Sequence, residues 1–208
     1  MLPGIITLMA LGNNERKTEN LVRDKLRQLD YYRDDNDINV EEQKSNIESV
    51  KRLLKFASKS GQGGKGSPEF IISSASTPDF LVIIECKADV RDHISSSCQE
   101  LLRGETIKEN ENEYAKRTQR YAVDGILHYA QFISKEYNVI AIAVTGENKK
   151  EAIISTYLHT KGTPKPKELQ TKENKAIEDI IPWRDYIEYR TFDPSVQRMR
   201  FNELMVIF

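Results

Sequence analysis

The chain has 208 residues, a length that fits one large domain or one domain with appendages. Its 31 lysines and arginines nearly balance its 32 aspartates and glutamates, so a uniformly basic nucleic-acid coat is excluded, although a local basic patch is not. Two cysteines cannot build a disulfide framework, and no apolar run approaches the roughly 20 residues that span a bilayer. The apolar start, residues 1–10, lacks the basic residues and cleavage pattern of a signal peptide. The composition therefore predicts a cytoplasmic protein without a membrane segment.

The first sixty residues predict two helices. Residues 14–30 begin with a capping asparagine, and Val22 and Leu26 recur at helical spacing. A second helix is expected over residues 40–58. The glycine-rich stretch 61–68 predicts a flexible loop.

Two strand-like runs come next, at residues 69–74 and 80–88, and the short connection between them predicts a hairpin. Residues 80–84 are apolar on both faces, which is typical of a central strand. The polar stretch 89–110 shows no regular pattern. Further along, the sequence predicts a long helix at 111–136, strands at 139–144 and 151–158, and an exposed basic loop at 161–167.

This order of elements predicts an α/β layer fold, with a central mixed sheet of about four strands flanked by helices. We expect one domain over residues 1–208, with a core at 14–158 and a C-terminal extension at 159–208.

Charged residues at the end of the apolar strand are candidates for a catalytic site. Glu85 and Lys87 are two residues apart, so both side chains leave the same face of the strand. If the hairpin turns at Thr77, the numbers of paired residues add up to 154, which places Glu69 opposite Glu85. Two opposed carboxylates repel one another, and a hard cation such as Mg²⁺ relieves the repulsion. The ammonium of Lys87 could stabilise developing phosphate charge.

Asp79 is an alternative first carboxylate, because Pro78-Asp79 also precedes the Glu-x-Lys triplet. Asp79 and Glu85 are six residues apart on one extended strand, about 20 Å. They could share a metal ion only if the chain bent sharply, so Glu69 is preferred.

Each of these residues also has an ordinary structural reading. A lone Glu-x-Lys triplet is frequent on solvated strand edges, and Glu19 suits the first turn of a helix for electrostatic reasons alone. Gln119 falls on the apolar face of its helix, where it serves either a site or a structural hydrogen bond. The three histidines, at positions 93, 128 and 159, form neither a zinc pattern nor a Ser/His/Asp constellation.

Several basic residues lie just before Glu69. Lys51, Lys55 and Lys59 share one face of the expected helix, and Lys65 follows in the loop. They form either an ordinary solvated face or a surface that steers phosphates toward the site. The glycine-rich loop is not a phosphate loop, because it precedes a strand rather than a helix.

Together these motifs resemble the PD-(D/E)XK nuclease superfamily, specifically the N-terminal nuclease modules of type I and type IIG restriction enzymes. The resemblance spans about residues 14–158 and is carried by Glu19, Gly66-x-Pro68-Glu69-Phe70-Ile71-Ile72, Glu85-Cys86-Lys87-Ala88-Asp89 and Gln119-Arg120-Tyr121-Ala122. It differs in having Glu69 where the superfamily usually has aspartate, and in lacking a tyrosine four residues after Gln119.

The resemblance implies a set of roles. Glu69, Glu85 and the main-chain carbonyl of Cys86 would hold Mg²⁺, for which Mn²⁺ could substitute, and Glu19 would join the metal shell. Lys87 would assist the attacking water, and Gln119 would approach the site. We place DNA-binding side chains at Lys55, Lys59, Lys65 and Arg120.

The function expected from the sequence is a Mg²⁺-dependent endonuclease module of a restriction system, acting on double-stranded DNA. The translocase, methyltransferase and target-recognition domains of complete enzymes do not fit in this chain and would be separate partners or attached domains. The alternative is a non-catalytic nucleic-acid-binding or protein-interaction module with a degenerate nuclease fold. RNA is a further possible substrate, because the phosphodiester chemistry is shared.

Overall fold

A computed structural model describes residues 4–60, 63–171 and 173–192, and side chains within these ranges from residue 15 to residue 189. Six strands form one sheet in the order β1-β2-β3-β4-β5-β6, in which β3 and β4 are parallel and the other neighbours antiparallel. The strands are β1 (Ile38–Glu42), β2 (Phe70–Ser74), β3 (Phe80–Lys87), β4 (Asn138–Thr145), β5 (Ile153–His159) and β6 (Lys167–Glu168). The α/β class with a mixed sheet is confirmed, but the sheet has six strands rather than about four.

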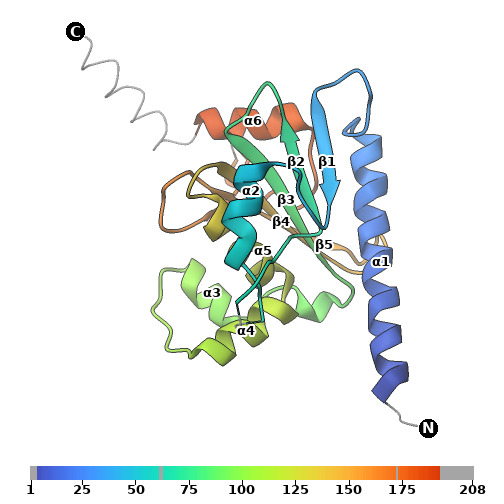
Figure 1. The fold of residues 1–208 in the computed structure, drawn as a ribbon, viewed down its shortest axis with the longest axis vertical. Helices are drawn as coiled ribbons and strands as arrows, with labels where there is room; N and C mark the ends of the chain where they lie inside the picture. The colour runs from blue at the N-terminus through green and yellow to red at the C-terminus, as the bar shows by residue number, and fades with distance from the viewer. Residues whose placement is uncertain (1–3, 61–62, 172, 193–208) are drawn as a thin grey trace.

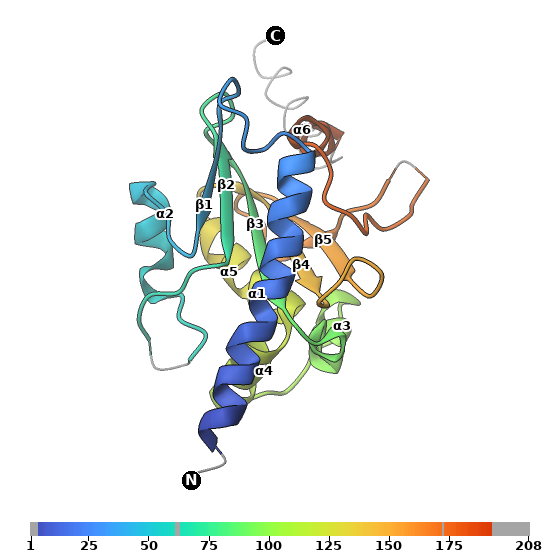
Figure 2. The ribbon, with the colours of Figure 1, turned by 90° about the vertical axis from the view of Figure 1, so that its right-hand side faces the viewer.

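Helices cover both faces of this sheet. They are α1 (Gly4–Gln28), α2 (Glu48–Leu53), α3 (Ser96–Leu102), α4 (Glu111–Arg120), α5 (Ala122–Ile133) and α6 (Trp183–Phe192), with short 3₁₀ turns at Leu54–Phe56 and Val90–Asp92. Figure 2 shows α1 running along one side of the sheet, with α5 on the other side.

The alternation of side chains along the strands divides the core into two layers. Side chains of even-numbered residues in β2 and β3 pack with Val22 and Leu26 of α1 and with Trp183 and Tyr186 of α6. The odd-numbered residues pack against α2, α3 and α5. Since every residue of β3 from Phe80 to Cys86 is buried, the predicted central position of this strand is confirmed.

The hairpin between β2 and β3 has the predicted register. Its directly opposite residues are Phe70 and Ile84, Ile71 and Ile83, and Ile72 and Val82, and the numbers of each pair add up to 154. The turn at its apex is closed by main-chain bonds, in which the Thr77 N–H donates to Ser74 and the Phe80 N–H to Thr77. The register fixes which residues meet at the open end of the hairpin.

The prediction of a helix at residues 40–58 is wrong for the first half of this segment. This segment begins as β1, whose Val40 pairs with Ile72 of β2, and α2 does not start until Glu48. Ile38 and Val40 alternate with polar residues and pack on the α1 side of the sheet, which favours a strand once β2 offers an unpaired edge. The remaining helix ends at Leu53 and tightens into a 3₁₀ turn, so it is much shorter than predicted.

The long helix predicted at residues 111–136 is divided in two at Tyr121. Tyr121 has extended backbone angles, φ −96° and ψ 136°, and it separates α4 from α5. The Val123 N–H, at the start of α5, donates to the carbonyl of His93 at 2.9 Å, a bond to a distant segment. The break is therefore fixed by tertiary contacts, in a stretch without proline.

Two further differences concern the ends of the predicted elements. Helix α1 begins at Gly4 instead of Asn14, and its N-terminal half extends beyond the sheet (Figure 1). The predicted C-terminal extension is part of the core as far as the structure describes it. Its Trp183 packs edge-on against Phe80 of β3, with ring centroids 5.3 Å apart. Residues 193–208 lie outside the described residues. No helix in the described part of the chain has the length and apolar character needed to cross a bilayer.

Candidate functional site

The candidate site lies where β2 begins and β3 ends. Glu69 immediately precedes β2, and extending the hairpin register by one pair places it opposite Glu85, on the α5 face of the sheet. Lys87 is the last residue of β3 and lies on that face too. The structure thus brings together the three residues that the sequence predicted as the centre of the site.

Glu85 is almost completely buried, with 1% of its surface exposed. Its Oε1 accepts from the Nζ of Lys59 in an ion pair, and the Nζ of Lys87 lies 3.5 Å from the same oxygen. Its Oε2 is also buried, but it has no hydrogen-bond partner among the described residues. A buried carboxylate oxygen without a donor is costly, and it marks a position where a cation or a water molecule would be stabilising.

Lys87 lies between two carboxylates. Its Nζ donates to Oε1 of Glu15, on α1, at 3.0 Å, and approaches Glu85 on the other side. Burial acts to lower the pKa of Lys87, but the charges of Glu85, Glu15 and Glu69 outweigh it, so the pKa lies above its ordinary value. Lys87 is therefore an ammonium at neutral pH, suited to stabilising negative charge rather than to accepting a proton.

Glu69 is partly buried at the entrance to the hairpin. Its Oε2 accepts a hydrogen bond from Nε2 of Gln43 at 3.2 Å. Burial and the negative charges of Glu85 and Glu19 raise the pKa of Glu69, although the bond from Gln43 opposes the change. The carboxylates thus repel one another electrostatically, and a divalent cation among them would relieve that repulsion.

Two further predicted ligands lie close by. Glu19 is buried on α1 and pairs with Arg23 at 2.8 Å, while its charge contributes to the raised pKa of Glu69. The side chain of Cys86 points away from Glu85, into the core beneath α1, and burial raises the pKa of its thiol well above the usual value. Their roles as metal ligands, through the carboxylate and the main-chain carbonyl, stay predictions.

Gln119 was expected on the buried face of its helix, and that expectation is wrong. Gln119 is exposed, whereas Ala115 and Thr118 form the buried face of α4. Its Nε2 donates to the main-chain carbonyl of Lys59 at 2.8 Å. Gln119 therefore reaches the site only indirectly, by holding the backbone of a lysine that contacts Glu85.

The basic surface predicted before Glu69 does not form as a helical face. The 3₁₀ turn at Leu54–Phe56 ends the helix, so Lys59 lies in the loop that follows it. The side chain of Lys59 points inward and contacts Glu85. Lys51 pairs with Glu48, and Lys55 lies over the ring of Phe56. Lys55 and Lys65 are exposed, and the guanidinium of Arg120 pairs with Asp92 at 2.8 Å.

Asp79 lies at the opposite end of β3 from Glu85. Its carbonyl accepts from the N–H of Asn138, at the start of the neighbouring strand β4. The prediction that Glu69, and not Asp79, faces Glu85 is consistent with the register of the hairpin.

The histidines serve structural bonds. His93 contacts the hydroxyls of Thr145 and Ser155, and His128 contacts the hydroxyl of Tyr114 and the carbonyl of Ala57.

Across residues 15–60, 63–171 and 173–189, no three His, Cys, Asp or Glu side chains gather in a way that could hold a metal ion.

A cleft of about 350 Å³ borders the site on the side of Lys87. Besides Lys87, its charged lining consists of Glu15, Asp89, Asp92, Glu147 and Glu151. A surface so rich in carboxylates attracts cations and repels a bare polyanion. A phosphate chain would approach Lys87 through this cleft only with its charge screened by cations.

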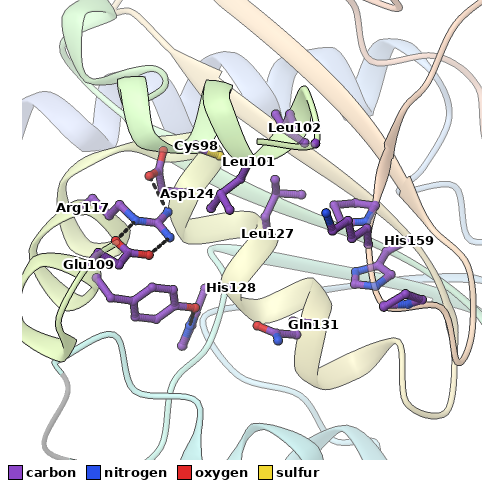
Figure 3. Close-up of a pocket in the computed structure, with 15 residues that line it drawn as sticks. Cys98, Leu101, Leu102, Glu109, Arg117, Asp124, Leu127, His128, Gln131 and His159 are labelled. Carbon is purple, nitrogen blue, oxygen red and sulfur yellow. Dashed lines mark hydrogen bonds and ion pairs between the residues drawn. The ribbon is translucent and has the colours of Figure 1, made fainter. Parts of the chain in front are cut away.

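A second cavity, also of about 350 Å³, lies away from this centre, between α3, α5 and residues 159–166 (Figure 3). Its apolar lining includes Leu101, Leu102 and Leu127, and its lining contains none of Glu69, Glu85 and Lys87. Figure 3 also shows Arg117 of α4 between the carboxylates of Glu109 and Asp124 at the edge of this cavity.

Sequence reasoning missed two contributors to the site and gave a third, Lys59, a different role. Glu15 lies one helical turn before Glu19, a spacing that could have suggested it. Gln43 follows β1, and it extends the register that pairs β1 with β2 to face Glu69. Lys59 was expected to bind DNA, and its ion pair with Glu85 carried no local signal, because the position of Lys59 depends on where α2 ends.

Compared with protein-family models, curated proteins and solved structures, the chain gave no match in any of the three.

Proposed function

We propose that this chain is a metal-dependent endonuclease module that hydrolyses phosphodiester bonds of double-stranded DNA. The observation that supports it is the meeting of Glu69, Glu85 and Lys87 at the open end of one hairpin, in the register expected from the sequence. The resemblance of this constellation to the PD-(D/E)XK nucleases of restriction systems favours the same reaction.

Although no three acidic, His or Cys side chains of the described residues gather to hold a metal ion, the carboxylates of Glu69 and Glu85 and the carbonyl of Cys86 offer oxygen ligands to a hard divalent cation. Glu85 offers a buried Oε2 without a hydrogen-bond partner among the described residues, and the charge of Glu85 helps to raise the pKa of Glu69. Oxygen ligands of this kind are those that Mg²⁺ and Mn²⁺ prefer. In this proposal Glu69, Glu85 and the carbonyl of Cys86 hold the ion, which would supply Lewis-acid polarisation of the phosphate and a more acidic bound water.

Lys87 supplies the electrostatic part of catalysis. Its ammonium emerges at the end of an otherwise buried strand and borders the cleft, so a phosphate in the cleft could reach it. Negative charge increases on the phosphate oxygens during hydrolysis, and a fixed ammonium stabilises that charge. Glu15 and Glu85 hold the lysine in place before substrate arrives.

A plasmid-nicking assay tests the proposal. Wild type should nick supercoiled plasmid with Mg²⁺ or Mn²⁺ and stop when the metal is chelated. Lys87→Met should keep the fold and metal binding but lower the rate by about 10²–10³, the usual effect of losing one transition-state donor. Glu85→Gln should abolish both metal binding and nicking.

Lys25→Met is a matched control. Lys25 also lies in an ion pair, with Asp179 at 2.6 Å, but on α1 it lies about 15 Å along the helix from Glu15, the residue that contacts Lys87. This variant should nick at the wild-type rate. If wild type binds Mn²⁺ yet nicks DNA no faster than Lys87→Met, the catalytic proposal is wrong; faster cleavage of RNA than of DNA would change the substrate class.

The alternative, a non-catalytic module with a degenerate nuclease fold, is favoured by one observation. Two ammonium groups, of Lys59 and Lys87, already neutralise Glu85. A site that relied on these ion pairs alone would need no metal, and wild type would then neither bind Mn²⁺ nor nick plasmid.

A further inference from the structure

Lys59 is an unusual neighbour for a catalytic carboxylate. Its side chain is 15% exposed, its ammonium contacts Oε1 of Glu85, and the ring of Tyr129 lies beneath the ammonium with its centroid 5.0 Å away. An ammonium over an aromatic face and against a buried carboxylate is stabilised twice. The position of this ammonium is therefore well defined.

Two features of the neighbouring helices maintain this position. Gln119 on α4 holds the backbone of Lys59 through its 2.8 Å bond to the carbonyl. Gly125 on α5 packs closely on the ion pair, because a Cβ at this residue would lie 2.8 Å from the main-chain oxygen of Thr118, 3.3 Å from the Nζ of Lys59 and 3.5 Å from Oε1 of Glu85. Residues from three separate segments thus enclose one ion pair.

The two oxygens of Glu85 are left in opposite conditions. Oε1 receives the ammonium of Lys59 and lies 3.5 Å from that of Lys87, whereas Oε2 is buried with no partner in the described part of the chain. An ion pair on one oxygen limits rotation of the carboxylate, so the other oxygen keeps a fixed direction. A carboxylate held in this way can give a metal ion one oxygen, not two.

We propose that Lys59 is a built-in cation of this centre, which occupies Oε1 of Glu85 in place of a second metal ion. Oε2 and Glu69 are then left to a single divalent cation. This inference rests on the proposed function, because it takes Glu69 and Glu85 as the metal ligands. Lys59 acts through Glu85, so it is a positioning residue.

Titration of the apo protein with Mn²⁺, followed by calorimetry and by the electron paramagnetic resonance of free Mn²⁺, tests the inference without DNA. Wild type should bind one ion per chain. Lys59→Met should bind Mn²⁺ about tenfold more tightly, since a like charge is removed from beside the ion, and should admit a second ion. Lys59→Arg keeps the charge and should bind one ion with the wild-type affinity.

Lys135→Met is the matched control. Lys135 also lies over an aromatic ring, that of Phe132 at 5.2 Å, but it is exposed. Its replacement should leave affinity and stoichiometry unchanged. If Lys59→Met does not fold, Gln119→Leu decides, because the loss of an exposed side chain should free Lys59 and tighten Mn²⁺ binding at least threefold.

The outcomes separate this inference from the proposed function. If wild type binds no Mn²⁺, the metal-dependent function fails. If wild type binds two ions, or if it binds one and Lys59→Met binds Mn²⁺ no more tightly than Lys135→Met, the role of Lys59 is wrong and the function stands. For the reserve variant, unchanged affinity in Gln119→Leu would likewise overturn the inference.

Discussion

Asp124 should be one of the most sensitive positions in the protein. It is 2% exposed at the start of α5, and it joins three helices. Its Oδ1 accepts from Oγ of Ser95 at 2.5 Å and from Nη1 of Arg117 at 2.8 Å, and its Oδ2 accepts from the N–H of Ser95 at 3.1 Å. Asp124→Ala removes the acceptor from all three donors at once.

The cost follows from these contacts. Each donor left unsatisfied in a buried place costs about 1–3 kcal/mol, and removing one partner of a buried ion pair costs about 3–5 kcal/mol. Arg117 keeps its second partner, Glu109, at 2.7 Å, which limits the loss. We expect the free energy of unfolding to fall by about 3–5 kcal/mol, equivalent to roughly 6–20 °C in Tm for a chain of this size.

Urea unfolding followed by circular dichroism measures this change, and the chain offers a matched control. Arg120, three residues after Arg117, forms a similar pair with Asp92, but the side chain of Arg120 is 63% exposed. Asp92→Ala should therefore leave the unfolding midpoint nearly unchanged, because exposed ion pairs contribute little. If the two variants lose similar stability, the burial of Asp124 does not set its contribution and the reasoning is wrong.

Two further predictions concern stability. Burial lowers the pKa of His93 to about 4, from about 6.5 in an unfolded chain, so the stability that neutral His93 contributes is complete above pH 6.5 and is lost as the pH falls toward 4. For this one residue, the free energy of unfolding changes by at most about 1.4 kcal/mol per pH unit. Urea midpoints measured at pH 7 and pH 5 should therefore fall more for wild type than for His93→Gln. An equal fall in both proteins would contradict this prediction. In Gly66→Ala the new Cβ would lie 2.1 Å from the carbonyl oxygen of Ala57 and 2.7 Å from the ring of Tyr129, so we expect a loss of about 1–3 kcal/mol. An unchanged Tm for this variant would show that the loop before Glu69 can shift freely.

The sequence by itself determined the hairpin and the residues at its open end. A strand that is apolar on both faces from Phe80 to Ile84 buries these side chains only in the centre of a covered sheet. The short connection around Thr77 then leaves one register for the preceding strand. Since side chains alternate along a strand, that register decides that Glu69, Glu85 and Lys87 share a face. Local pattern and turn length carry this information, so it can be read without the fold.

Tertiary structure decided what surrounds these residues. Whether residues 38–42 form a strand or the start of a helix depends on the free edge of β2, and the break at Tyr121 depends on contacts with His93. Gln119 lies on an exposed face because α4 and α5 are separate helices with different buried faces.

Lys59 illustrates the same limit most clearly. Its ammonium reaches Glu85 only because the helix before it ends early, Gln119 holds its backbone, and Gly125 leaves room on α5. These contacts join segments 26 to 66 residues apart along the chain. Local propensity acts over a few residues, so an ion pair assembled from such distant segments is determined only when the helices pack on the sheet.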